Sequence, residues 1–429
     1  MKKIERKWRV IFHKKFAFII ILSLTLSLSA QTIVTIEECQ QWAVAQSSAN
    51  VQKELNEQLL KVKLNDAGSH YYPSLEVLGI ISYQSDVPQL PLTIPEADKI
   101  SKDQYRVGME LYQVIFDGGK ILLNRRHEYL ANETEINKLD LTINRLKEQV
   151  IYLYLNLLII DKQYAILTNV EKTISDQLDQ LKIMLKEGVI YGNAVVLLDI
   201  EQLKIEQQKG ELQATKGSIL SSLSILTGKD LSNAEFIIPD VAEEEPNTES
   251  FRLEYNIFKN NIVGLDYKKK LHYATTIPQI SLVGMGGYGR TTFDVFSNKF
   301  GWFYYVGIFF RVPVINWAKT TGVGNIINLQ KSILEAQKSD FEKENKIAIQ
   351  EKLNEIQRIE ELLRLDKQIT DKYKEITATY RIQLVNGSIT VYDYIKQQND
   401  EIQSLISQEL HAFQLLKAKY ELKALKGKL

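Results

Sequence analysis

Residues able to do catalytic or metal chemistry are sparse in this chain. There is one cysteine, Cys39, which excludes a disulfide framework and a multi-cysteine zinc site. The five histidines lie far apart in the sequence: His13, His70, His127, His272 and His411. Outside helical faces the carboxylates do not cluster, and no nucleophile stands beside a base. The sequence therefore predicts no enzyme, no metal site and no cofactor.

One phosphate-binding pattern, GxGxxG, occurs at residues 284–289. A dinucleotide site needs a helix that begins directly after this pattern, because the helix N-terminus binds the pyrophosphate. Residues 290–295 are poor helix formers, and Gly301 follows soon after. Small residues within a strand are the better interpretation, so no nucleotide is expected here.

Charge is unevenly distributed along the chain. The 53 basic and 53 acidic residues give a formal net charge of zero. Residues 1–30 hold seven basic residues and one acidic residue, which leaves a net charge of −6 on residues 31–429. Nucleic acid is therefore not an expected partner, since its phosphates need a basic surface.

Residues 1–30 have the features of a secretory signal peptide. A basic segment precedes the apolar stretch 16–28, and small residues lead to a cleavage position after Ala30. The alternative is a membrane anchor, but a spanning helix needs about 20 apolar residues. We expect an exported mature chain without a transmembrane helix. Strands that cross an outer membrane remain compatible with this pattern.

Three glycine pairs recur at an offset of 199 residues: Gly108 and Gly307, Gly188 and Gly387, and Gly228 and Gly427. Their flanking residues match as well. The sequence therefore predicts two copies of one unit. The first repeat covers 31–232, an acidic linker covers 233–250, and the second repeat covers 251–429.

Each repeat begins with a helical segment, at 35–70 or about 250–273, which Pro73 or Pro278 ends. Two strands follow in each repeat. Apolar residues alternate in them with the period of two that is typical of strands. The predicted strands lie at about 74–86, 103–115, 279–291 and 301–313.

Each predicted strand is long enough to cross a membrane when tilted. The aromatic residues Trp302, Tyr304 and Phe310 predict a girdle at the membrane interface. An ordinary sheet core is the alternative interpretation of the same residues.

Long helices follow the strands. Residues 120–187 and 318–386 contain no proline, and their only glycines are Gly322 and Gly324. At 1.5 Å per residue, each helix would be roughly 100 Å long. Apolar spacings of three and four predict coiled-coil packing. Return helices at 193–226 and 389–426 close two antiparallel pairs.

Four strands with an apolar outer face cannot close a barrel, because small barrels start near eight strands. An open edge in lipid leaves unpaired backbone groups, each of which costs several kcal/mol. Membrane strands of this chain must therefore close with other protomers. The predicted fold class is mainly α with a membrane β-barrel. Three protomers give a 12-stranded barrel and an α-helical periplasmic barrel.

The ordered set of these features resembles the TolC family of outer-membrane efflux proteins. It comprises the repeat, the strand entry Tyr72-Pro73-Ser74, the strand exit Phe116-Asp117-Gly118-Gly119, the paired long helices and the opening Thr35-Ile36-Glu37-Glu38-Cys39. The family's helix-return motif is a glycine followed six residues later by aspartate. Gly387 and Asp393 match it, whereas Gly188 is followed by Ala194.

The resemblance implies a homotrimeric, porin-like channel in the outer membrane of a Gram-negative bacterium, surrounded by outer-membrane lipid and extending into the periplasm. It implies the exit duct of a tripartite efflux or type I secretion system. Such a duct is a passive conduit, driven by an inner-membrane transporter through a periplasmic adaptor protein. The helix-tip turns that would dock the adaptor contain Gly188, Val189, Ile190, Gly387, Ser388 and Ile389.

In the family, the aspartate that matches Asp393 helps to form an acidic ring at the periplasmic gate, which would attract cations. A second family aspartate falls on Lys396, so Asp393 and Lys396 are the gate candidates. The alternative for Asp393 is an acid that favours the helix dipole. The alternative function is a pore-less periplasmic coiled-coil adaptor or structural protein, against which the two repeated hairpins argue.

Overall fold

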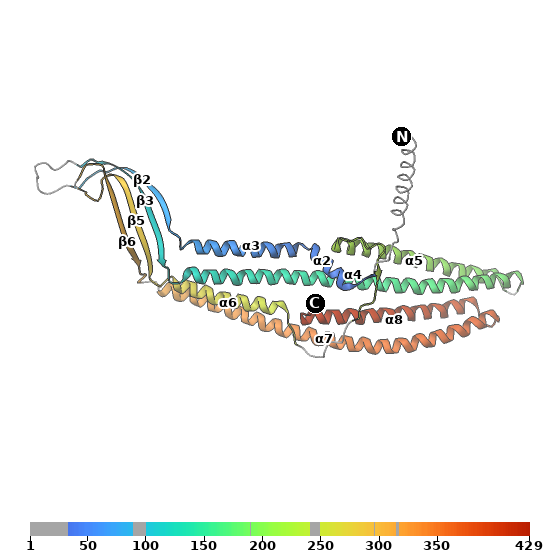
Figure 1. The fold of residues 1–429 in the computed structure, drawn as a ribbon. Coiled ribbons are helices and arrows are strands. Elements are labelled where there is room, and N and C mark those ends of the chain that lie inside the picture. The colour runs from blue at the N-terminus through green and yellow to red at the C-terminus, as the bar shows by residue number, and fades with distance from the viewer. Residues whose placement is uncertain (1–32, 89–99, 189, 241–248, 296, 315–316) are drawn as a thin grey trace, which may run out of the picture. The chain divides into compact units, whose positions relative to one another are not determined.

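A computed structural model describes residues 33–88, 100–188, 190–240, 249–295, 297–314 and 317–429. The protein is mainly helical with a few strands, as the sequence predicts. The order helix, strand, strand, long helix and return helix occurs twice along the chain (Figure 1). The predicted signal peptide lies outside the described residues.

Four long helices dominate the structure: α4 (Lys120–Lys186), α5 (Gly192–Thr227), α7 (Trp317–Val385) and α8 (Val391–Lys426). Helices α4 and α7 contain 67 and 69 residues, and neither has a proline to block continuation. Gly188 and Gly387 follow them with φ of 76° and 68°. Glycine adopts this left-handed conformation readily, so both long helices end at these residues.

The predicted helical segment at 35–70 is helical and consists of two helices, α2 (Ile36–Gln46) and α3 (Ser48–Ser69). Ser47 separates them with extended backbone angles of −69° and 132°. Its hydroxyl oxygen accepts a hydrogen bond from the Ala49 amide at 3.2 Å. Serine at such a position caps a new helix. The matching helix of the second half, α6, is continuous from Leu253 to Ala274.

Four antiparallel strands form one sheet in the order β2–β3–β5–β6. They are β2 (Ser74–Tyr83), β3 (Asp103–Phe116), β5 (Gln279–Arg290) and β6 (Gly301–Arg311), which lie side by side in Figure 1. Gly108 of β3 is opposite Gly287 of β5. A Cβ atom at Gly287 would lie 2.4 Å from the Val107 carbonyl oxygen, so the two backbones need glycine to approach here.

A short parallel pair, β1 (Ile33–Val34) with β4 (Glu235–Phe236), was not predicted. Tyr154 of α4 is fully buried beside it. The Tyr154 hydroxyl oxygen lies 2.8 Å from the carbonyl oxygens of Val34 and Ile237, and accepts from the Ile237 amide at 3.1 Å. Strands of two residues leave no periodicity in a sequence, so only the tertiary contacts reveal this pair.

The chain forms two compact units, and each draws on both predicted repeats. One consists of the described parts of 1–46, 146–243 and 356–420. Its core joins α4 and α5 to α7 and α8, with Leu198 and Tyr394 almost fully buried. The other consists of the described parts of 47–145, 244–355 and 421–429, and it contains the four-stranded sheet.

Candidate functional site

One face of the sheet, here called the apolar face, is hydrophobic along all four strands. Residues directly opposite each other in antiparallel strands point to the same side. The register assigns to this face Leu75, Val77 and Ile81 of β2, Val107, Met109 and Leu111 of β3, Ile280 and Leu282 of β5, and Trp302, Tyr304, Val306, Ile308 and Phe310 of β6. Polar exceptions are Gln113 and, near the loops, Asp103 and Arg290.

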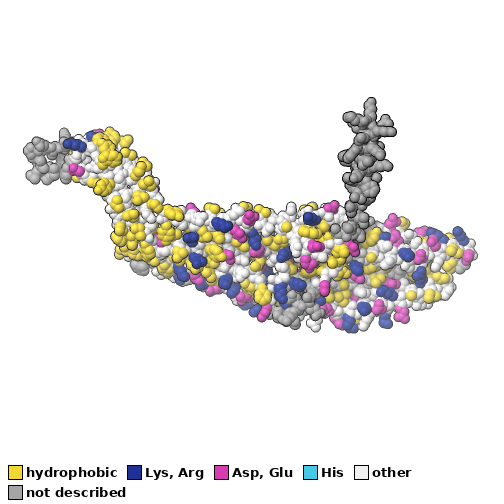
Figure 2. Space-filling model, viewed as in Figure 1, with side chains coloured by type: hydrophobic (Ala, Val, Ile, Leu, Met, Phe, Trp, Pro, Cys, Tyr) yellow, Lys and Arg dark blue, Asp and Glu magenta, His cyan; other side chains and the backbone are white. Residues whose placement is uncertain are grey.

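The apolar face is open to solvent in the single chain. Val77, Val107 and Val306 are 67%, 54% and 72% exposed. Figure 2 shows hydrophobic side chains covering the strands, whereas charged side chains are scattered over the helices. Water-soluble monomers rarely expose a contiguous apolar surface of this extent. The sheet therefore needs an apolar environment or a partner.

The opposite face, here called the polar face, mixes charged, polar and apolar residues. Glu76 of β2 is directly opposite Glu110 of β3, a pairing of like charges. The Ser281 hydroxyl donates to the Tyr112 hydroxyl at 2.9 Å. Arg106 is opposite Gly289 on the same face. One apolar and one partly charged face is the pattern of a wall between lipid and water.

The three predicted interface aromatics all lie on the apolar face of β6. Trp302, Tyr304 and Phe310 are 83%, 81% and 64% exposed. Trp302 packs against Tyr288, with ring centroids 5.2 Å apart, and Tyr288 stacks on Phe300 at 6.0 Å. Tyr and Trp rings with one apolar and one polar end suit a membrane interface. Their role in a girdle stays a prediction.

Strands β2 and β6 are the edges of the sheet, and among the described residues each has a neighbouring strand on one side only. An edge strand offers unpaired N–H and C=O groups to another chain. Neither edge contains a lysine or proline within its strand to block such pairing. Both edges are therefore unprotected in the single chain.

Asp117 fixes the transition from β3 to α4. Its carboxylate oxygens accept hydrogen bonds from the amides of Gly119 and Ile121, each at 2.8 Å. Gly118 has a φ of 74°, and a Cβ atom there would lie 2.9 Å from the Cβ of Ile277. The motif Phe116-Asp117-Gly118-Gly119, which resembles the TolC family, therefore has a local structural role. It caps the start of α4 where the chain leaves β3.

Two turns of equal length join the long helices in pairs, at 187–191 and 386–390. In the second turn the Gly387 amide donates to the Leu384 carbonyl at 3.0 Å, and the Ser388 amide donates to the Gln383 carbonyl at 2.9 Å. This pair of bonds is a Schellman motif, which satisfies the last carbonyls of α7. The sequence correctly identified Gly387 as the end of the helix.

The first turn is described except for Val189, which lies outside the described residues. The Gly188 amide donates to the Leu185 carbonyl at 3.1 Å. Ile190 in this turn and Ile389 in the second are half-buried, and both pack against the hydrophobic core of their unit. Each turn is therefore anchored by an isoleucine that lies two residues after an exposed glycine.

Asp393 forms a capping box at the start of α8. Its carboxylate accepts hydrogen bonds from the Thr390 amide at 3.1 Å and the Thr390 hydroxyl at 2.6 Å. The Asp393 amide donates back to the Thr390 hydroxyl at 3.2 Å. These bonds, with a smaller effect of Lys396, hold the pKa of the Asp393 carboxyl below its ordinary value. The helix N-terminal role that sequence reasoning left open is therefore present.

The turn between α4 and α5 has no such capping box. The equivalent residues are Tyr191 and Ala194, and α5 begins without a side-chain hydrogen bond at its cap. A Thr-x-x-Glu box does occur at the start of α2, where the Thr35 amide donates to Glu38 at 2.9 Å. Sequence reasoning could have found both boxes, since Ser/Thr-x-x-acid before a helix is a recognisable signal.

Lys396, the second gate candidate, is exposed one turn after Asp393 on α8. The neighbouring residues Val391 and Tyr394 are buried in the core of the unit. Asp393 and Lys396 thus share the exposed side of the helix. A role in a gate is compatible with this side and stays a prediction.

The glycine-rich pattern and the single cysteine both lie inside secondary structure elements. The glycine-rich pattern 284–289 lies inside β5, not before a helix. Cys39 is buried, and burial with the nearby Glu38 raises the pKa of its thiol to about 12, which makes it a poor nucleophile. No group of three or more metal-ligating residues occurs in the described part of the chain.

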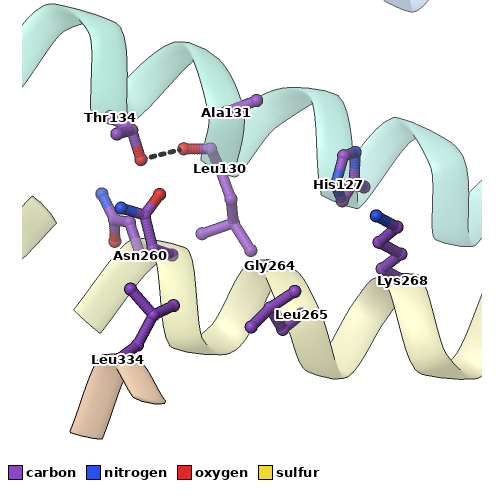
Figure 3. A pocket seen from close by; sticks show the side chains of 10 residues that line it. His127, Leu130, Ala131, Thr134, Asn260, Gly264, Leu265, Lys268 and Leu334 are labelled. Carbon is purple, nitrogen blue, oxygen red and sulfur yellow. Dashed lines mark hydrogen bonds between the residues drawn. The ribbon is translucent and has the colours of Figure 1, made fainter. Parts of the chain in front are cut away.

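A cavity of about 240 Å³ lies between α4, α6 and the first part of α7 (Figure 3). Leu130, Leu265 and Leu334 supply much of its apolar lining, and His127 and Lys268 lie together at one end. The Thr134 hydroxyl donates to the Leu130 carbonyl of its own helix at 2.9 Å. The lining residues contain no acid–base pair and no metal-ligand set.

Among the described helices, α4 is long and apolar enough to cross a membrane by length and composition alone. Its most apolar stretch is 44% buried, and Val150, Tyr154 and Leu157 of this helix are fully buried. Core helices of soluble proteins pass the same test, so this property alone is weak evidence for a membrane span.

Sequence comparison with models of known families found no match, and neither did comparison with curated proteins. Comparison with solved structures found outer-membrane proteins. The outer membrane protein VceC of Vibrio cholerae matches with a TM-score of 0.71 and 11% identity, over 91% of this chain and 96% of that one. The Campylobacter jejuni CmeC outer membrane channel matches at 0.69 and 14%, over 94% and 91%.

A third match is the Neisseria gonorrhoeae MtrE outer membrane channel, crystallised in its open state. Its TM-score is 0.67 at 12% identity, over 92% of this chain and 89% of that one. The fold of this protein is therefore the fold of outer-membrane channels, along nearly the whole chain. This confirms the likeness to the fold of the TolC family, whereas the barrel and the trimer stay predictions.

Proposed function

We propose that this protein is an outer-membrane channel of a Gram-negative bacterium and serves as the exit duct of an efflux or type I secretion system. The shared fold with outer-membrane channels supports the proposal. Energy for transport comes from an inner-membrane transporter, since the sequence indicates no nucleotide site. The duct itself is a passive conduit.

The observation that carries the proposal is the four-stranded sheet, with one exposed apolar face and two unprotected edges. An apolar face of this kind is stable in lipid, but edges in lipid leave backbone groups unpaired. Pairing β2 of one protomer with β6 of the next removes both edges. Three protomers then close a 12-stranded barrel, which gives the homotrimer.

In such a barrel the apolar face contacts outer-membrane lipid and the polar face lines the lumen. Glu76 and Glu110 then bring two carboxylates per protomer to the lumen, which favours cations over anions. This assignment explains why the polar face contains charged residues, because a water-filled lumen solvates their charges.

A periplasmic adaptor is the expected partner of the helix turns. The turns at 187–191 and 386–390 carry an exposed glycine two residues before a core-anchored isoleucine. Such a turn offers a small, rigid surface of backbone to a partner. The α4–α5 and α7–α8 pairs then belong to the periplasmic part, and Asp393 with Lys396 to its gate.

The runner-up is a pore-less periplasmic adaptor or structural protein. Its coiled coils would account for the long helices. It leaves the exposed apolar face of the sheet without an explanation, because a sheet in the periplasm contacts water on both faces. The channel is therefore the better account of the same residues.

The test is single-channel recording of detergent-purified protein in a planar bilayer, with the oligomeric state measured in mild detergent. We expect a heat-stable trimer and steady, cation-preferring channels. Asp393→Asn retains hydrogen-bond acceptors at the cap and removes the charge, so a reduced cation preference would place Asp393 in the lumen. A water-soluble protein without channel activity would contradict the proposal.

A further inference from the structure

Aromatic side chains gather on the polar face of the sheet at the end where β5 turns into β6. Phe303 and Tyr305 of β6 point to this face, because they alternate with Trp302 and Tyr304. The ring of Phe293, from the β5–β6 connection, lies 5.5 Å from Phe303 and 5.8 Å from Tyr305. Both contacts are edge-on, the favourable geometry for aromatic pairs.

Phe303 is unusually well covered for this sheet. It is 7% exposed, whereas the adjacent Trp302 and Tyr304 exceed 80%. The ring extends across Gly287, where an added Cβ atom would lie 2.8 Å from the Phe303 Cζ atom. Phe293 covers it from the loop and is itself 59% exposed. The loop thus holds the Phe293 ring against the polar face. The outer surface of this ring, which points away from the sheet, remains exposed.

The β5–β6 connection also contacts the apolar face, through a different phenylalanine. Phe300 stacks on Tyr288 at 6.0 Å and on Tyr105 at 6.4 Å, both of which belong to the apolar face. The Asn298 side chain accepts a hydrogen bond from the Ser101 amide at 2.9 Å, just before β3. Contacts on both faces and to a second strand fix the loop over the end of the sheet.

The topology identifies which end of the sheet this is. Strand β5 follows helix α6, and β6 leads toward helix α7. The β5–β6 connection therefore lies at the end of the strands that is opposite to both helices. In the proposed orientation this is the extracellular mouth of the barrel.

We propose that Phe293, supported by Phe303 and Tyr305, forms an aromatic constriction inside the extracellular mouth of the channel. The inference rests on the proposed function, which assigns the polar face to the lumen. Three copies place three exposed phenyl rings around the lumen at one level. A ring of apolar side chains hinders hydrated ions and lets amphipathic solutes with an apolar surface slide past. Phe293 is thus a specificity-determining residue of the exit.

The test compares Phe293→Ala with Phe310→Ala in planar bilayers. Both variants remove one phenyl ring, but Phe310 lies on the apolar face, at the end of β6 away from the β5–β6 connection. We expect Phe293→Ala to raise the conductance in potassium chloride roughly twofold or more, since three apolar side chains leave the constriction together. Phe310→Ala should conduct like the unmodified protein. Equal conductance of Phe293→Ala and the unmodified channel would overturn the proposal.

A second measurement covers the case that Phe293→Ala assembles poorly. Phe293→Cys can be treated with a cationic methanethiosulfonate reagent added to the extracellular side of open channels. The native thiol of Cys39 is buried, so the unmodified protein serves as the control. We expect a stepwise fall in conductance for Phe293→Cys only. Phe293→Cys channels that conduct but whose conductance does not change with the reagent would refute the constriction. Absence of channels in the unmodified protein would instead refute the proposed function.

Discussion

A lysine placed at Val77 distinguishes a membrane sheet from a sheet in water. Val77 is the fourth residue of the ten-residue strand β2, points to the apolar face and is 67% exposed. Leu78 is adjacent, points to the polar face and is 37% exposed. The two positions share strand, depth and neighbours along the chain, so Leu78→Lys is a matched control.

The two environments predict opposite rankings of the variants. In lipid, a lysine near the bilayer midplane on the outer face of a barrel destabilises the folded state by about 2–4 kcal/mol. This corresponds to roughly a 30- to 700-fold change in the folding equilibrium. Leu78→Lys faces the lumen and should stay within about 1 kcal/mol. In water, the more exposed Val77 would accept lysine at least as easily as Leu78.

The assay is refolding from urea into phosphocholine vesicles, followed by tryptophan fluorescence and by the gel mobility of heat-stable trimers. We expect Val77→Lys to shift the refolding midpoint strongly to lower urea and Leu78→Lys to shift it little. Equal shifts, or a larger shift for Leu78→Lys, would refute the assignment of the apolar face to lipid.

Three further predictions concern the helices. Tyr154→Phe removes the hydroxyl from a buried position and leaves the Ile237 amide without that partner, so chemical denaturation should show a loss of about 1–3 kcal/mol. Asp117→Ala removes two amide contacts at the start of α4 and should cost about 1–2 kcal/mol in the same measurement, with Asp117→Asn milder. The lowered pKa of Asp393 means that the α8 cap stabilises the folded state above the ordinary aspartate pKa and is lost as the pH falls through the lowered value. The protection factors of the amides at the start of α8, which correct exchange for its intrinsic pH dependence, should therefore fall in acid in the native protein but not in Thr390→Ala, and equal acid responses would contradict the cap.

The order of helices and strands is visible in the sequence because it depends on local chemistry. Proline is absent from the two longest helices, and glycine ends each of them, so residues near 120–186 and 317–385 are readable as helix. Apolar residues alternate in the strands because successive side chains of a strand point to opposite faces of the sheet. These signals need no knowledge of neighbours in space.

Helix caps that depend on one or two residues can be predicted only from those residues themselves. Ser47 divides the first helical segment, and a serine between two helical runs is a cap signal that was passed over. Thr390 with Asp393 is likewise a local capping pattern, which sequence reasoning reduced to the charge of Asp393 alone. In both cases the hydrogen bond lies within three residues along the chain.

Contacts between distant segments are decided by tertiary structure. Nothing local relates Tyr154 to Val34 and Ile237, which lie 120 and 83 residues away. The same holds for the contact between Phe293 and Phe303. Phe293 lies in a loop, where no periodic pattern predicts the direction of a side chain.

The sequence by itself determined the elements, their order and the apolar alternation of four strands, since these follow from side-chain type and spacing. Tertiary structure decided the strand order β2–β3–β5–β6, which brings the two halves together at Gly108 and Gly287 and leaves β2 and β6 as edges. That order follows from close backbone approach between glycines 179 residues apart, a contact that no local pattern encodes.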